Sequence, residues 1–170
     1  MLSKKIEEAL NKQVELEAVS SQLYLAMASW AETKGYNGAA AFLYAHSDEE
    51  RLHMLKLLKY VNERGGHGGV PALKQPPKTF SSLSEVFNQI LKHEIVVSSE
   101  INKLVDSCIS EKDYTTNNFL QWYVAEQIEE ERVAKSILDR LNLAGGDKGS
   151  LFLFDKELET MATTPNTVQP

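Results

Sequence analysis

The chain has 170 residues, a single cysteine (Cys108) and a formal net charge of −6; 42% of its residues are hydrophobic and 25% are charged. This balance is typical of one folded domain, excludes an intrinsically disordered chain and a disulfide framework, and argues against general binding to nucleic-acid phosphates. No apolar run approaches the roughly 18–20 residues of a membrane span, and the N-terminal residues mix lysine with glutamate where a signal peptide would be apolar, so we expect a cytoplasmic protein without a membrane partner.

Glycine and proline are almost absent from four long stretches and crowd the segments between them. The stretches cover residues 3–34, 37–64, 82–111 and 114–143. Each carries apolar side chains three and four residues apart, the spacing typical of an amphipathic helix. Ser82 and Glu85 have the spacing of a capping box, and the fourth stretch ends before Gly145 and Gly146. A shorter apolar segment at 148–160 predicts a fifth helix, so the sequence predicts an all-α four-helix bundle.

The lengths of the connections predict how the helices run. Only two or three residues join the first helix to the second and the third to the fourth, so each pair should form an antiparallel hairpin. The connection at 65–81 can reach about 56 Å at roughly 3.3 Å per extended residue. It is long enough to cross the whole bundle, so we expect the third helix to run parallel to the second. Residues 1–162 would then form one domain and 163–170 a flexible C-terminal tail.

Polar side chains interrupt the apolar face of each long helix near its midpoint. They are Glu17 on the first helix, Glu50 and His53 on the second, Glu94 on the third, and Gln127 and Glu130 on the fourth. Because mid-helix positions of such a bundle meet at one level, these six side chains should converge in the core. Burying four unpaired carboxylates would cost several kcal/mol per ion, and these stripes hold no lysine or arginine at that level. Two divalent cations would balance them, and oxygen ligands with an imidazole suit iron or manganese.

Several runs of this sequence resemble one protein family, the bacterial non-haem ferritins of the ferritin A type. The matching runs are GAAAFL at 38–43, His46, DEERLH at 48–53, NFLQWYVAEQIEEE at 118–131, LAGG at 143–146 and DKEL at 155–158. The resemblance covers residues 1–160 and implies a ferritin-like four-helix bundle with a long crossover and a short fifth helix. It also implies a hollow shell of 24 subunits in which the fifth helix lines the fourfold contacts.

The resemblance further implies a ferroxidase centre in the middle of the subunit. The first iron ion would be held by Glu17, Glu50 and His53. The second would be held by Glu50, Glu94 and Glu130, so that Glu50 bridges the two ions, with Gln127 close by.

Two further features of the family have matching residues in this chain. Tyr24 matches a tyrosine beside the centre that can supply an electron. A third iron site of the bacterial members matches Glu49, Glu126, Glu129 and Glu130.

Neighbouring families differ from this sequence at identifiable positions. Bacterioferritins carry a second Glu-x-x-His where this chain has Gln127 and Glu130, and a haem-binding methionine where it has Arg51. Rubrerythrin-like peroxidases add a four-cysteine iron domain, which a chain with one cysteine cannot build. We therefore expect no haem.

These observations lead to one expected function and two alternatives. We expect an iron-storage ferroxidase that oxidises Fe(II) with O2 or H2O2 and stores hydrated ferric oxide inside its shell, without a nucleic-acid partner. A di-iron oxidoreductase acting on an organic substrate or peroxide would instead be a monomer or dimer with a substrate pocket. A metal-free helical scaffold would leave the converging acids unexplained.

Overall fold

The computed structural model describes residues 1–162, so the predicted tail at 163–170 lies outside the described residues. The helices are α1 (Lys4–Thr33), α2 (Asn37–Glu63), α3 (Leu83–Ser110), α4 (Tyr114–Ala144) and α5 (Lys148–Ala162). Within the described part there is no strand, and no helix there is long and apolar enough to cross a membrane. The predicted all-α bundle with a short fifth helix is confirmed, and each helix end lies within two residues of its predicted position.

The predicted capping box of α3 forms in a shifted version. The hydroxyl oxygen of Ser82 accepts a hydrogen bond from the backbone N–H of Glu85 at 3.1 Å, as expected. The carboxylate of Glu85, however, accepts hydrogen bonds from the backbone N–H and the hydroxyl of Ser81, one residue earlier than the capping box predicts. At the C-terminal end of α4, the helix is capped by Gly145, whose φ of +59° lies in the left-handed region that favours glycine.

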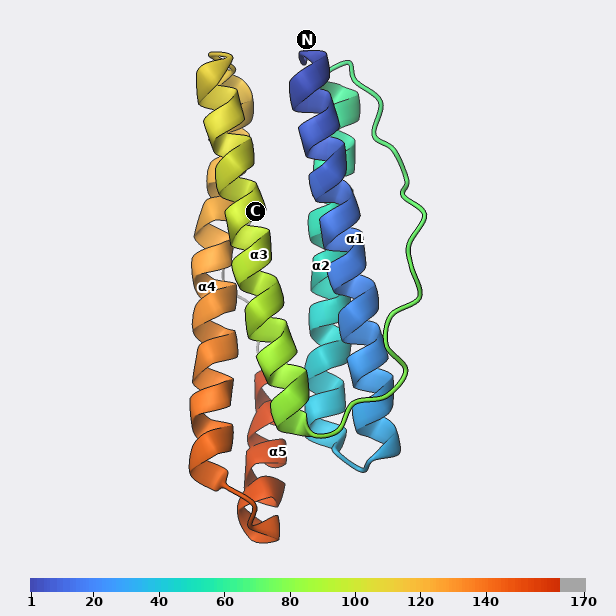
Figure 1. Cartoon of the computed structure of the whole chain (residues 1–170), viewed down its shortest axis with the longest axis vertical. Coiled ribbons are helices and arrows are strands. Elements are labelled where there is room, and N and C mark those ends of the chain that lie inside the picture. Colours follow the sequence, from blue (N-terminus) through green and yellow to red (C-terminus); the bar gives the residue numbers. More distant parts are fainter. Residues whose placement is uncertain (163–170) are drawn as a thin grey trace.

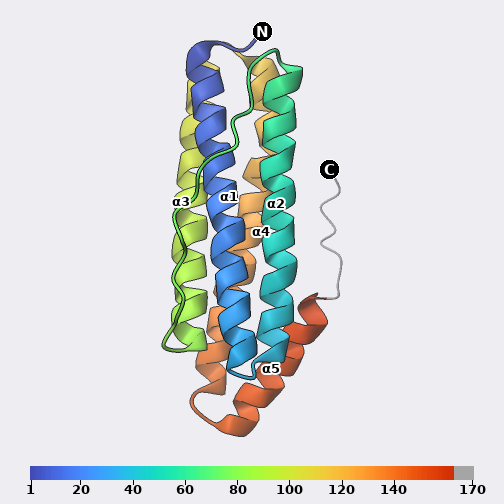
Figure 2. The same cartoon turned by 90° about the vertical axis from the view of Figure 1, so that its right-hand side faces the viewer.

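The long crossover runs the length of the bundle. It leaves the end of α2, passes along α1 and reaches the start of α3 at the opposite end, so α3 runs parallel to α2 as predicted (Figures 1 and 2). Its first residues are held by α1: Glu7 accepts a hydrogen bond from the backbone N–H of His67 at 2.9 Å, and Asn11 bonds the backbone of His67 and of Gly69. Near its end, Phe80 packs edge-on against Trp30 with ring centroids 5.6 Å apart.

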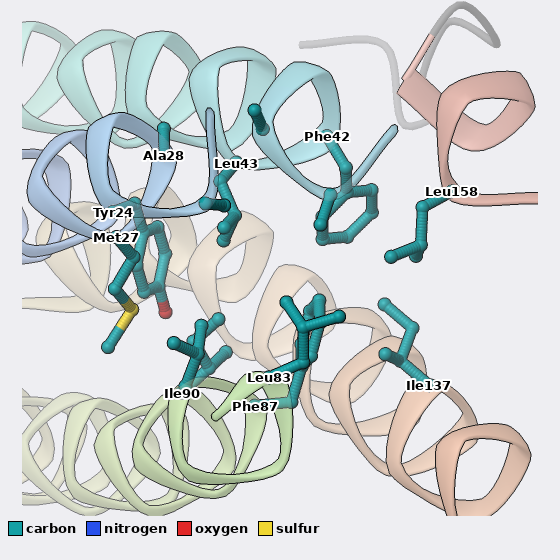
Figure 3. Close-up of a cluster of buried hydrophobic side chains, with 14 of the residues drawn as sticks. Tyr24, Met27, Ala28, Phe42, Leu43, Leu83, Phe87, Ile90, Ile137 and Leu158 are labelled. Carbon is teal, nitrogen blue, oxygen red and sulfur yellow. The ribbon is translucent and has the colours of Figure 1, made fainter. Parts of the chain in front are cut away.

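The buried core is divided into two apolar halves. One half contains, among others, Met27, Leu43, Phe87 and Ile137 (Figure 3). The other contains, among others, Leu10, Leu57, Ile101 and Leu120. On every long helix the two halves are separated by a short interval near the midpoint. The polar residues predicted to converge lie in these intervals, so the fold leaves one polar level across the centre of an otherwise apolar bundle.

Helix α5 docks against the start of α2 through a buried carboxylate. The oxygens of Asp155 accept hydrogen bonds from the backbone N–H groups of Gly38 (3.0 Å) and Ala39 (2.9 Å). The N-cap residue of α2, Tyr36, makes no side-chain cap of its own, so α5 supplies the acceptor that this helix end needs. The approach is so close that a Cβ on Gly38 would lie 1.7 Å from the backbone oxygen of Asp155.

Candidate metal centre

The four long helices bring all six of the predicted core polar side chains into the polar level. None of the six residues is more than 6% exposed. They are Glu17 on α1, Glu50 and His53 on α2, Glu94 on α3, and Gln127 and Glu130 on α4. Charged groups are rarely buried this completely unless they are paired or bind a metal.

Glu17, Glu50 and His53 form the tightest predicted group. Their possible ligand atoms all lie within 4.8 Å of one another, and Nδ1 of His53 is 3.4 Å from Oε2 of Glu50. The amide of Gln13 donates to Oε1 of Glu17 at 2.8 Å, and the hydroxyl of Tyr123 donates to the backbone oxygen of His53 at 2.8 Å. The first contact orients the Glu17 carboxylate, and the second holds Tyr123 against the backbone of α2 at His53. The group has the nitrogen and oxygen donors of a divalent-metal site.

Glu94 faces the centre from α3 but is held by neutral donors. The hydroxyl of Tyr24 donates to Oε1 of Glu94, and the amide of Gln127 donates to Oε2 at 3.0 Å. Among the described residues, Glu94 does not join Glu50 and Glu130 in a group with all ligand atoms within 4.8 Å of one another. The structure thus places Tyr24 and Gln127 directly against a predicted ligand, while the predicted second set is more widely spaced than the first.

Burial changes the acidity of these carboxyl groups. It raises the pKa of Glu50 and of Glu94 to about 7. The pKa of Glu17 is raised well above its ordinary value by burial and by the neighbouring Glu50, and that of Glu130 by burial and by Glu50 and Glu94. Without a cation the centre therefore retains protons near neutral pH, and a bound cation would displace them.

The residues predicted for a third iron site separate into different surroundings. Glu49 and Glu126 form a group with His53 in which all ligand atoms lie within 4.8 Å of one another. Glu129 is instead paired with the guanidinium of Arg132, which lowers the pKa of Glu129. Glu130 forms another close group with Glu49 and His46. Three of the four predicted residues therefore lie in two overlapping groups that share Glu49.

Two aromatic residues beside the centre had no role in the sequence-based prediction. The ring of Trp122 packs edge-on against His53 with centroids 5.1 Å apart, and against Tyr123 at 4.8 Å. The ammonium of Lys56 lies 3.6 Å from the centre of the Trp122 ring. The available sequence signal was that Tyr123 belongs to the apolar stripe of α4, which places Trp122 at its edge near the level of the centre.

Comparison with known proteins identifies relatives of this chain over nearly its whole length. The family model described as "Ferritin-like domain" matches residues 7–144. A probable bacterial non-heme ferritin-like protein of Haemophilus influenzae is 46% identical over 163 residues, which cover 96% of this chain and 99% of the relative. A bacterial non-heme ferritin of Campylobacter jejuni is 42% identical over 162 residues, which cover 95% and 97% of the two chains.

Solved structures agree with these sequence relatives. An open-pore ferritin from the archaeon Archaeoglobus fulgidus matches with a TM-score of 0.92 and 40% identity, over 97% of this chain and all of that one. A structure described as a humanized archaeal ferritin matches with a TM-score of 0.94 and 41% identity over the same shares of the two chains. The resemblance to bacterial non-haem ferritins is thereby confirmed, and the chain belongs to the ferritin-like family.

Proposed function

We propose that this chain is the subunit of an iron-storage ferritin and that its buried polar level is a ferroxidase centre. The observation that carries the proposal is the convergence of four carboxylates and one imidazole, from four helices, in the middle of an apolar core. A scaffold protein would gain nothing from this arrangement, because unpaired buried charges destabilise a fold. A pair of Fe(II) ions as substrate would balance the four carboxylates.

The donor atoms fit this substrate. In the proposed complex Glu17, Glu50 and His53 hold the first Fe(II), and Glu50, Glu94 and Glu130 hold the second. In the metal-free protein the Glu94 carboxylate accepts hydrogen bonds from the Tyr24 hydroxyl and the Gln127 amide. The second Fe(II) would compete with these two donors for the carboxylate oxygens, and Gln127 would stay beside Glu94. Because these carboxyl groups retain protons without metal, binding of Fe(II) should release protons and strengthen as the pH rises through about 7.

The ligand set also favours oxidation of the bound iron. Hard anionic oxygens stabilise Fe(III) more than Fe(II), which makes each ion a better electron donor. Two Fe(II) ions lose one electron each, and O2 takes up the two electrons with two protons to give H2O2; H2O2 is the alternative oxidant. In the proposed reaction Tyr24 supplies a further electron, and the contact of its hydroxyl with Glu94 supports this role.

In the proposed protein the ferric product leaves the centre and is stored as hydrated oxide. Glu49, Glu126, Glu129 and Glu130 form a third iron site on this route. Twenty-four chains enclose the storage cavity, and the shell works in the cytoplasm.

A double variant tests the ferroxidase proposal directly. Glu50→Ala with His53→Ala removes two ligands of the first Fe(II) and one of the second. Loss of a residue that only hydrogen-bonds to a metal ligand already weakens metal binding or activity by about 10–100-fold. Loss of the ligands themselves should therefore slow rapid Fe(II) oxidation by more than about 100-fold. The rate is measured from the rise in ferric absorbance after Fe(II) is added in air.

The matched control is Glu8→Ala with His67→Ala, which removes the same two residue types from exposed positions. This control should oxidise Fe(II) at the parental rate. An unchanged rate in the Glu50→Ala, His53→Ala variant, with helical content preserved, would contradict the proposed centre.

A further inference from the structure

Glu131 is the last of three consecutive glutamates on α4, and its carboxylate is engaged by the neighbouring helix α3. The hydroxyl of Ser98 donates to Oε1 of Glu131. Both side chains are partly buried, and neither residue had a role in the sequence-based prediction. An ionised carboxylate only accepts hydrogen bonds, so Glu131 takes the one proton that the Ser98 hydroxyl can donate.

The Ser98 oxygen in turn faces the amide of Gln127. The amide nitrogen lies 3.4 Å from this oxygen, 3.3 Å from the backbone oxygen of Glu94 and 3.0 Å from Oε2 of Glu94. The backbone oxygen only accepts hydrogen bonds, and so does the Ser98 oxygen here, because its proton is committed to Glu131. The N–H groups of the Gln127 amide, and not its oxygen, therefore point toward α3.

Packing alone does not fix this orientation of the amide. Ser98, Gln127 and Glu131 line a cavity of about 140 Å³ between α3 and α4, so this side of the amide is not enclosed by tightly packed side chains. The oxygen and nitrogen of an amide are also nearly alike in size, so an amide turned by 180° would fit the same space. The two orientations differ in their hydrogen bonds, and Ser98 with Glu131 contributes to the choice between them.

The orientation of Gln127 matters because Glu94 is a proposed ligand of the second Fe(II). A carboxylate oxygen has two lone pairs, so Oε2 of Glu94 can accept the Gln127 N–H with one of them while the other faces the ion. Hydrogen-bond partners of this kind orient ligating carboxylates, and their loss weakens metal sites by about 10–100-fold. An amide turned by 180° would instead direct its oxygen at the Glu94 carboxylate and repel it.

We propose that Ser98 and Glu131 are positioning residues for the second Fe(II), which together hold the Gln127 amide with its N–H groups toward Glu94. They act through Gln127 and are not themselves ligands. The inference rests on the proposed function, because the second Fe(II) belongs to the proposed ferroxidase centre. It adds to that function the pair of residues on α3 and α4 that keeps the Glu94 carboxylate oriented.

The test is the binding of Co(II), without iron or oxygen, to the parent protein and to Ser98→Ala. Alanine removes the acceptor for the Gln127 amide and leaves the Glu131 carboxylate in place. Calorimetric titration should find the affinity at the second position about 10-fold lower, the lower end of the range because Ser98 acts through another residue. In crystals soaked at limiting Co(II), the anomalous peak beside Glu94 should weaken while the peak beside His53 persists.

Two further serine variants separate the hydrogen bond from a general disturbance of α3. Ser98→Thr keeps a hydroxyl at this position and should bind Co(II) at the second position with the parental affinity. Ser99→Ala removes the same group from the adjacent, exposed position and is the matched control. It should bind both ions like the parent.

Variants of Glu131 test the other member of the pair. Glu131→Ala removes the acceptor and frees the Ser98 proton to bond the Gln127 oxygen, so the second position should weaken here too. Glu131→Gln removes the charge but keeps an oxygen that can accept the Ser98 proton, and its affinity should stay closer to that of the parent. Comparison of these two variants separates the hydrogen bond from the charge, and it also tests the inference if Ser98→Ala does not fold.

The inference is overturned if Ser98→Ala and the parent bind Co(II) at the second position with equal affinity, or if the parent binds no Co(II) there. It is also overturned if the losses of Ser98→Ala and Glu131→Ala multiply in the double variant, because residues that act as one unit lose no more together than the larger single loss. The proposed ferroxidase activity is judged separately, from Fe(II) oxidation by the parent protein. Either proposal can therefore fail while the other stands.

Discussion

Glutamates of this chain differ in acidity according to their surroundings. Burial raises the pKa of Glu94 to about 7, because the charged form loses its hydration and gains only neutral hydrogen-bond donors. Glu100, on the same helix, lies at the surface between Lys12 and Lys103, and its pKa is lowered by hydrogen bonds to these ammonium groups. Glu94 and Glu100 are six residues apart on one helix, yet the pKa of the first is raised and the pKa of the second is lowered.

This contrast predicts how the stability of the metal-free protein depends on pH. Between the ordinary value of 4.5 and about 7, the folded chain keeps protons on Glu50 and Glu94 that the unfolded chain has lost. The folded state therefore binds more protons, and stability must fall as the pH rises through this window. Glu94→Gln should reduce this pH-dependent loss of unfolding free energy by on the order of 1–3 kcal/mol. Each kcal/mol corresponds to about 2–4 °C in Tm for a chain of this size.

The measurement is a series of thermal melts of the metal-free protein across that pH window. Glu100→Gln is the control, since its carboxyl group has the opposite shift and lies at the surface. If Tm falls equally with pH in the parent and in Glu94→Gln, the buried carboxyl group of Glu94 does not cause the pH dependence of stability.

At the scale of elements, α5 is joined to the bundle by contacts made at the start of α2. The Asp155 carboxylate accepts two backbone N–H groups at that helix end, where a negative charge also interacts favourably with the helix dipole. Phe154 and Leu158 are buried in the apolar half of the core that lies toward this end. Figure 3 shows Leu158 of α5 beside this cluster. The docking tolerates no side chain at Gly38, because the nearest atom is backbone and cannot rotate away.

Gly38→Ala should therefore displace α5 without disturbing the metal centre. We expect a loss of about 1–3 kcal/mol in stability and faster hydrogen exchange of the α5 amides. Gly146→Ala is the matched control, because a Cβ at Gly146 meets no atom within 4 Å. Unaltered protection of α5 in Gly38→Ala would mean that the helices can separate enough to admit a methyl group.

At the scale of the whole molecule, three large apolar side chains are exposed on α5 and on the end of α4 that precedes it. Leu143, Phe152 and Leu153 are 87%, 62% and 69% exposed. Large exposed apolar side chains that gather in one region mark sites of protein association. They fit the proposal that α5 lies at a contact between subunits.

The proposed shell would contain 24 copies of a 19.1 kDa chain, so it predicts a particle of about 460 kDa. Size-exclusion chromatography with light scattering measures this mass. Phe152→Glu with Leu153→Glu places charge on the exposed face of α5 and should shift the protein to smaller species. A parent protein that elutes as a monomer or dimer would refute the storage shell and favour a di-iron enzyme without storage.

Local sequence was sufficient to predict the helices, their directions and the level of the polar residues. Helical periodicity and glycine-rich boundaries are properties of a few consecutive residues, and the length of the 65–81 connection restricts where α3 can begin. Counting from helix ends then placed Glu17, Glu50, Glu94 and Glu130 at one height. In the structure these four residues are buried at the middle of their helices. The count works because an α-helix rises by a constant distance per residue, so residue number gives the height along the bundle.

Only the tertiary structure decided which partner each polar group meets. Neighbouring residues on a helix point about 100° apart. Glu129 therefore pairs with Arg132 at the surface while the adjacent Glu130 is buried in the core, although both belong to the same run of glutamates. The contact of Asp155 with Gly38 joins residues 117 positions apart, and the approach of His46 to Glu130 joins α2 to α4. These contacts depend on how closely whole helices pack and which rotamers fit between them, and neither is a property of any short stretch of sequence.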